Sequence, residues 1–256
     1  MRMSKKRYLN LLREIAVCEF KLKDQSTVLG LFWSFLNPVI MLLVLLLFFS
    51  LNTGKDIPYY GIYLLIGIVH YTHFSNSTNA AMAALTGMRE LTANVMFPKE
   101  VLVMGSIISN AIEFVITMIV AAAIAWFSGI ALTWTVLLLP FIIGLQTLTV
   151  LWLSLVLSCL HVFVRDVSHI YQVFLRLLFF VTPIFYAPSY VGNSFARYIV
   201  AINPLAHFIK FSRLALMEGT PFPGAAFGLF LGLNAFAIVV TLFVFRKYES
   251  KFAEYV

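Results

Sequence analysis

Two histidines could do chemistry inside the most apolar part of this sequence. His70 and His73 stand three residues apart in GIVHYTHFSNSTN, so on a helix they share one face. A metal ion needs more ligands than two imidazoles, and the nearby sequence offers none. We therefore expect both histidines to line a polar interior or to hydrogen-bond between helices, and the polar run 75–79 must also face protein or water.

A carboxylate, Glu113, falls near the middle of another long apolar run. A charge at that depth in a bilayer costs about 3 kcal/mol and needs protein or water around it. At 1.5 Å per helical residue, Glu113 lies about 18 Å and Arg176 about 12 Å from the cytoplasmic side, a difference that an arginine side chain can span. We expect the two to form a structural ion pair; the alternative is a proton-coupling carboxylate, which would indicate a secondary transporter.

Catalytic and nucleotide-binding motifs are missing from the sequence. It contains no G-x-x-x-x-G-K-[ST] phosphate-binding loop, no G-x-S-x-G and no H-E-x-x-H. An integral-membrane enzyme is therefore the weaker hypothesis, and we expect no catalytic residue, no bound metal and no nucleotide cofactor on this chain.

The composition is that of a membrane protein, with 61% hydrophobic and 11% charged residues and a mean hydropathy of +0.94. Soluble domains carry about 25% charged residues. Apolar runs of roughly 20 residues, the length that crosses a bilayer, predict an all-α protein with six transmembrane helices. These spans are expected at 28–51, 59–83, 101–127, 133–160, 168–187 and 222–245.

Lysine and arginine set the orientation, because cytoplasmic loops are enriched in them. With both termini in the cytoplasm, thirteen of the 18 basic residues lie inside and one, Arg176, lies within a span. The four left outside are Lys55, Arg197, Lys210 and Arg213. The net charge of +7 thus indicates topology and not nucleic-acid binding. The start of the chain lacks a signal-peptide core, and Cys18 and Cys159 are expected to be packing residues.

Three segments are too polar or too broken to span. Residues 4–27 have helical periodicity and predict an amphipathic helix on the cytoplasmic face, either as an anchor or as a docking surface. The link 85–101 predicts a short cytoplasmic helix carrying Arg89 and Glu90 before Pro98. After Pro183 and Pro188, the segment 188–221 holds only short apolar pieces, which we expect to be re-entrant at the outer face.

The order of these features resembles the permeases of ABC-2 type transporters, in particular the Wzm-type exporters of O-antigen, capsule and teichoic acid. The similarity covers essentially the whole chain. The residues that carry it are Gly30, Trp33 and Pro38; Asn94, Phe97, Pro98, Lys99 and Glu100; Arg165 and Asp166; Thr182, Pro183, Ile184, Phe185 and Tyr186; and Asn203, Pro204 and Arg213. The family often has tryptophan at the position of His70 and an aromatic residue near that of His73, so a sugar-stacking role is not carried over to these two positions.

The resemblance implies a subunit that exports a lipid-linked glycan across the bacterial inner membrane; export of drugs or small lipids is the alternative. It implies a homodimer with two copies of a separate ATPase, which bind the ATP and magnesium, and a division into a cytoplasmic helix, 1–27, and a six-span domain, 28–256, with a cytoplasmic tail, 246–256. The expected ATPase-coupling residues are Arg89, Glu90, Asn94, Phe97, Pro98, Arg165 and Asp166. The expected pathway or structural residues are Trp33, His70, His73, Glu113, Arg176, Pro183, Tyr186 and Arg213.

Overall fold

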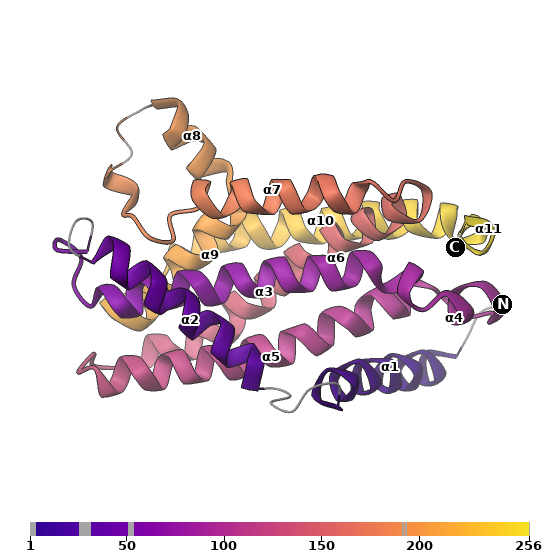
Figure 1. The fold of residues 1–256 in the computed structure, drawn as a ribbon, viewed down its shortest axis with the longest axis horizontal. Helices are drawn as coiled ribbons and strands as arrows, with labels where there is room; N and C mark the ends of the chain where they lie inside the picture. Colours follow the sequence, from indigo (N-terminus) through magenta and orange to yellow (C-terminus); the bar gives the residue numbers. More distant parts are fainter. Residues whose placement is uncertain (1–3, 26–31, 51–53, 191, 193, 256) are drawn as a thin grey trace.

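The computed structural model describes residues 4–25, 32–50, 54–190, 192 and 194–255, and within them every regular element is a helix (Figure 1). The long helices lie side by side along one axis. Both ends of the chain, with the short helices α4 (Arg89–Asn94) and α11 (Phe252–Tyr255), gather at one end of the bundle, whereas α8 (Ser194–Ile202) stands at the opposite end. Gly30, one of the residues that carry the family resemblance, lies outside the described residues.

Four helical segments of the described chain are long and apolar enough to cross a membrane, which confirms the all-α membrane class. They are Phe32–Phe49 (α2), Glu100–Phe127 (α5), Trp134–Phe163 (the turn η1, Trp134–Leu138, with α6, Leu139–Phe163) and Gly224–Tyr255 (α10, Gly224–Tyr248, with η4, Glu249–Lys251, and α11). The two other predicted spans, 59–83 and 168–187, correspond to α3 (Tyr60–Gly87) and α7 (Val167–Val181). Helix α3 is long enough to cross but less apolar than the four segments, and α7 is apolar but has only 15 residues.

Helix α7 ends at Val181, six residues before the predicted end at 187. Thr182 has extended backbone angles, φ −76° and ψ 134°. A residue before proline is driven out of the α region by the proline ring, and Pro183 follows. The proline break therefore ends the helix itself and does not merely bend it.

Helix α3 is the central element, in contact with α2, α5, α6, α7 and α9 (Pro204–Arg213). This explains why its polar half is compatible with a membrane. Ser77 and Thr78 are fully buried, and the Thr78 hydroxyl donates to the Phe74 carbonyl while accepting from the Tyr171 hydroxyl on α7 at 2.8 Å. The prediction that this polarity faces protein is thus confirmed for these two residues.

Helix α1 (Lys5–Gln25) confirms the predicted N-terminal helix and packs against α5. The contact is close: a β-carbon placed on Gly105 would lie 2.5 Å from the Ile15 side chain. The Tyr8 hydroxyl also donates to the Met104 sulfur at 3.3 Å. One face of α1 is therefore covered by protein, whereas Leu9 on another face is exposed.

Candidate functional site

The proline break at 182–186 leaves backbone carbonyls without helical partners, and Arg213 of α9 satisfies two of them. Its guanidinium donates to the Pro183 carbonyl at 2.8 Å and to the Ile184 carbonyl at 2.9 Å. It also donates to the Tyr63 carbonyl at 2.9 Å and lies over the Tyr63 ring, 3.3 Å from its centroid. Arg213 is 7% exposed, so its charge is solvated by carbonyl dipoles and an aromatic face.

Two tyrosines of α3 satisfy the next two carbonyls. The Tyr60 hydroxyl donates to Phe185 at 2.8 Å, and the Tyr63 hydroxyl donates to Tyr186 at 2.9 Å. Four successive carbonyls, 183–186, are thus bonded by side chains. Irregular backbone inside a membrane is tolerated only where protein or water receives its polar groups, and here three side chains from α3 and α9 do so. Sequence reasoning named Arg213 and Tyr186 but missed Tyr60 and Tyr63.

Asn203 connects the outer segment to the same break. Its side-chain oxygen accepts from the Leu205 amide at 3.0 Å and caps α9, and its amide nitrogen donates to the Thr182 hydroxyl at 2.8 Å. Pro204 occupies the first position of α9, where its missing N–H costs nothing. Helix α9 is largely buried, so this piece of 188–221 is packed against the rest of the protein. Helix α8 instead exposes Phe195 and Tyr198.

His70 is the centre of a buried hydrogen-bond network. Its Nδ1 bonds to the Gln146 side-chain oxygen on α6, its Nε2 bonds to the Ser212 hydroxyl on α9 at 2.8 Å, and the Gln146 amide donates to the His70 carbonyl at 2.9 Å. Since the Gln146 nitrogen is the donor to that carbonyl, its oxygen must accept, and the neutral Nδ1–H tautomer of His70 fits. His70 therefore joins three helices, the role expected for it, through partners that the sequence did not indicate.

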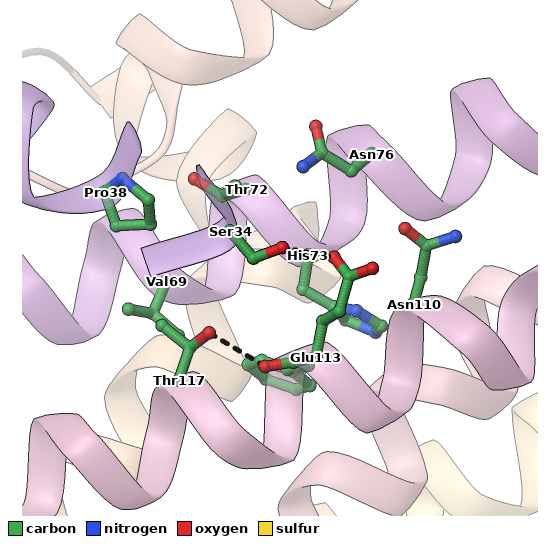
Figure 2. A pocket seen from close by; sticks show the side chains of 10 residues that line it. Ser34, Pro38, Val69, Thr72, His73, Asn76, Asn110, Glu113 and Thr117 are labelled. Carbon is green, nitrogen blue, oxygen red and sulfur yellow. Dashed lines mark hydrogen bonds between the residues drawn. The ribbon is translucent and has the colours of Figure 1, made fainter. Parts of the chain in front are cut away.

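His73 and Glu113 line a polar pocket between α2, α3 and α5 (Figure 2). The His73 ring stacks on Phe114, with centroids 4.1 Å apart and planes 4° apart, and its Nδ1 bonds to Ser77 at 3.1 Å. Glu113 reaches from α5 toward α2, where the Ser34 hydroxyl donates to its carboxylate at 3.0 Å. The other residues that line the pocket are Pro38, Val69, Thr72, Asn76, Asn110, Phe114 and Thr117.

The expected ion pair between Glu113 and Arg176 is not formed within the described chain. Arg176 is exposed on α7, and α7 packs on α3 and α6, while Glu113 faces α2. Similar depth along two helices does not bring side chains together when a third helix separates them. Of the other candidates, Trp33 is exposed on α2 and the Tyr186 hydroxyl donates to the Val181 carbonyl at 2.7 Å.

At the opposite end, the predicted short helix forms as α4 and presents Arg89, Glu90 and Asn94 to the surface. Its C-terminal end is fixed by Lys99, whose ammonium donates to the carbonyls of Val95 at 2.6 Å and Leu91 at 3.2 Å. The same ammonium lies 4.6 Å from the Phe97 ring centroid. Burial lowers the pKa of Lys99 below its ordinary value, while the Glu249 carboxylate opposes that change. Phe97 and Pro98 are half-buried behind this helix.

The C-terminal tail packs onto α4, a contact that the sequence did not indicate. Arg246 at the end of α10 forms an ion pair with Glu100 at the start of α5, with 2.8 Å between nitrogen and oxygen. The Glu249 carboxylate accepts from the Lys99 amide. Phe252 of α11 is fully buried against Phe245 and Phe163. The link before α5 and the tail after α10 therefore form one packed unit.

Arg165 and Asp166 are both exposed between α6 and α7. Asp166 occupies the position before the first residue of α7, but its side chain makes no capping hydrogen bond. Its backbone carbonyl accepts from His169 at 3.0 Å and Ile170 at 3.1 Å. The Asp166 side chain therefore does not cap α7, and both charges lie on the surface.

Comparison with known proteins places these features in a family context. Residues 11–217 match the sequence model of the ABC-2 type transporter family. The chain is 31% identical over 199 residues to the "O-antigen export system permease protein RfbA" of Myxococcus xanthus, covering 77% of this chain and 76% of that protein. It is 27% identical over 239 residues to the protein of the same name from Klebsiella pneumoniae, covering 92% and 91%. It is 23% identical over 229 residues to the "Polysialic acid transport protein KpsM" of Escherichia coli, covering 84% and 83%.

Proposed function

Because this chain belongs to the ABC-2 type transporter family, we propose that it is the membrane-spanning permease of an ATP-driven exporter of lipid-linked polysaccharide, of the O-antigen, capsule or teichoic-acid type. The observation that carries this proposal is the similarity to O-antigen export permeases over most of the length of both chains. A relative named as a polysialic acid transport protein extends the similarity to the transport of a second polysaccharide.

The topology we propose has six spans, with α3 and α7 added to the four apolar segments. A helix of 28 residues such as α3 is about 42 Å long, enough to cross. Helix α7 has 15 residues and is about 22 Å long, so the bonded segment 182–186 completes its crossing. Both chain ends lie at one end of the bundle (Figure 1), as an even number of spans requires. We assign that end to the cytoplasm of the inner membrane, and 188–221 to a re-entrant outer lip.

The polysaccharide pathway is proposed to run between two copies of the chain. The interior of this bundle is filled by close-packed side chains, including Leu64, Ile66, Ile68, Leu102 and Ile142, all 0% exposed. A packed interior has few voids larger than a water molecule, so a sugar polymer needs a space that the described part of one chain does not provide. Helix α2 is covered by protein along very little of its length and is available to face a second copy.

Power is proposed to come from two copies of a separate ATPase, which bind the ATP and magnesium. Helix α4 suits the contact because it is braced by Lys99 and the tail yet exposes Arg89 and Glu90. Charged and polar side chains at the rim of an interface dock in water and set orientation. Lys and Arg near the pathway entrance would attract the diphosphate of the lipid-linked glycan.

The function is tested in a strain that lacks this chain. We expect surface polysaccharide to disappear and its lipid-linked precursor to accumulate inside, as measured by mass spectrometry of extracted lipids, with rescue by the intact chain. Copurification with an ATPase encoded nearby is the second expected result. Unchanged surface polysaccharide together with proton-dependent uptake in vesicles would replace this proposal with a secondary transporter.

A further inference from the structure

An apolar groove of about 230 Å³ lies between α6 and α10, near the C-terminal ends of both helices. Each helix contributes one face. The residues of α6 that line it are Leu155, Val156, Cys159, Leu160 and Phe163, and those of α10 are Thr241, Val244, Phe245 and Tyr248. The Thr241 hydroxyl donates to the Ile238 carbonyl at 3.2 Å, so even this residue offers the groove no unsatisfied donor.

The groove has defined upper and lower limits. Above it, Asn234 of α10 clamps the two helices together, since its side-chain oxygen accepts from Thr149 at 2.8 Å and from the Trp152 indole at 3.0 Å. Below it, the rings of Phe163 and Tyr248 meet edge to face with centroids 6.1 Å apart. Between these contacts the facing side chains leave the groove open, and α10 is otherwise mostly uncovered by protein.

Two basic residues flank the lower limit. Lys247 follows Arg246 on the last turn of α10 and is exposed, and Arg165 follows the end of α6 and is exposed as well. Arg246 itself pairs with Glu100. Lys247 directly precedes Tyr248, and Arg165 lies two residues after Phe163, so each helix of the groove has an exposed cation within two residues of the lower limit, at the proposed cytoplasmic end.

We propose that the groove binds one acyl chain of an anionic phospholipid from the cytoplasmic leaflet, with the phosphate held between Arg165 and Lys247. An apolar channel takes a hydrocarbon chain because burying methylene groups is favourable. Basic residues between transmembrane helices at the cytoplasmic side select anionic headgroups. The site goes beyond the proposed function, because it serves the lipid around the permease and not the exported polymer.

The decisive comparison uses two valines one turn apart on α10. Val244 lines the groove and Val240 does not, although they are 41% and 43% exposed. The full-length chain, purified in detergent, is titrated with phosphatidylglycerol or with phosphatidylethanolamine of the same acyl chains, and bound lipid is counted by native mass spectrometry. We expect Val244→Trp to abolish retention of phosphatidylglycerol and Val240→Trp to preserve it. Equal retention by both variants would reduce the groove to an ordinary annular contact and overturn the proposal.

The selection of anionic headgroups is tested separately with other variants, because a tryptophan variant that folds poorly would lose lipid for an unrelated reason. Arg165→Gln and Lys247→Gln should each reduce the preference for phosphatidylglycerol about fivefold, the factor for one basic residue near an anionic surface. Unchanged preference in both would refute the headgroup assignment. Stronger retention of undecaprenyl phosphate than of phosphatidylglycerol would overturn the choice of occupant and assign the groove to the lipid anchor of the substrate.

Cys159 gives an internal reporter in the unmutated groove. It lines the wall and is 8% exposed, while the other cysteine, Cys18, is exposed on α1. In a Cys18→Ser background, phosphatidylglycerol should slow labelling of Cys159 by an apolar maleimide, and phosphatidylethanolamine should not. Equal labelling rates with both lipids would count against the proposal. None of these measurements depends on export activity, so they fail independently of the proposed function.

Discussion

Arg213 shows at the scale of one residue how a charge can be buried in this protein without a carboxylate partner among the described residues. Its guanidinium donors point at three backbone carbonyls, of Tyr63, Pro183 and Ile184, and its face lies on the Tyr63 ring. Gly67 provides the space that the guanidinium occupies, since a β-carbon there would lie 3.1 Å from it. Arg213 therefore joins α9 to α3 and to the segment that follows the broken end of α7.

Replacing Arg213 with alanine should therefore destabilise the fold by several kcal/mol, because each buried carbonyl left unsatisfied costs about 1–3 kcal/mol. Thermal unfolding of the purified chain in detergent measures this, and Lys210→Ala serves as the control because Lys210 is exposed on the same helix. If the two variants unfold at the same temperature, the hydrogen bonds of Arg213 to the three carbonyls do not stabilise the fold.

His70 gives a second prediction at this scale. His70→Ala removes a group that satisfies both Gln146 and Ser212 in a fully buried site, so the free energy of unfolding should fall by about 2–4 kcal/mol from lost hydrogen bonds and cavity formation. His169→Ala, at an exposed position on α7, should leave the unfolding temperature nearly unchanged. A role of His70 confined to contact with substrate would instead leave stability intact and change only export.

At the scale of elements, α4 and the tail form a unit that joins the start of α5 to the end of α10. Lys99 fixes α4, Glu100 pairs with Arg246, and α11 packs beside α4. A helix of six residues is far too short to be stable alone. Its conformation therefore depends on these contacts, and a force applied to α4 is passed to two spans.

Charge removal on α4 should uncouple the exporter. In the double variant Arg89→Ala, Glu90→Ala we expect export to fall at least about tenfold while the ATPase continues to hydrolyse ATP. The exposed pair is proposed to dock the ATPase, and a loss of about 1.4 kcal/mol of binding free energy corresponds to a factor of ten. Surface polysaccharide and ATP hydrolysis are measured together. The control is Lys251→Ala with Glu254→Ala, an exposed pair of opposite charges at the same end; equal export in the two double variants would contradict the coupling role of α4.

The tail contact leads to a prediction on stability. Phe252→Ala removes a fully buried ring from the cluster with Phe245 and Phe163 and should cost about 3–5 kcal/mol. Tyr255→Ala, on the same short helix but 54% exposed, should cost far less. Thermal unfolding followed by protease sensitivity of the link 85–101 distinguishes them; protection of that link in Phe252→Ala would show that α11 does not brace α4.

In the whole molecule, a tightly packed bundle lies between two ends that carry the elements proposed to function in transport. The proposed outer end carries α8 and the bonded proline break, and the other end carries α4, α11 and both termini (Figure 1). The interior holds the polar links His70–Gln146–Ser212 and Thr149–Asn234, which fix the relative positions of α3, α6, α9 and α10. Motion during transport is therefore expected between chains more than within one bundle.

Membrane topology provides the whole-molecule prediction. In a Cys18→Ser, Cys159→Ser background, single cysteines at Ser4, Arg89 and Lys251 should react with an impermeant maleimide only in inverted vesicles, and one at Ser194 only in intact spheroplasts. This pattern follows from six spans with both ends cytoplasmic. Labelling of Ser4 and Lys251 from opposite sides would require an odd number of spans and would contradict the proposed topology.

The sequence alone predicted the features that depend on runs of neighbouring residues. Apolar length and basic loops predicted the helical membrane class, a short helix within the link 85–101, the N-terminal helix and the position of the proline break, because hydropathy, charge and the conformational limits of proline act locally along the chain. Pro183 and Pro188 also predicted that the fifth helix is broken, but the predicted helix end was residue 187, whereas α7 ends at Val181.

Only the tertiary structure decided which distant side chains meet. Arg213 reaches carbonyls about thirty residues earlier, Glu113 meets Ser34 and not Arg176, and His70 finds Gln146 and Ser212. Depth along a helix can be counted from the sequence, but neighbours across helices depend on which helices pack together and on how each is rotated about its axis. Those are properties of the assembled bundle, where the burial of polar groups allows only the pairings that satisfy them.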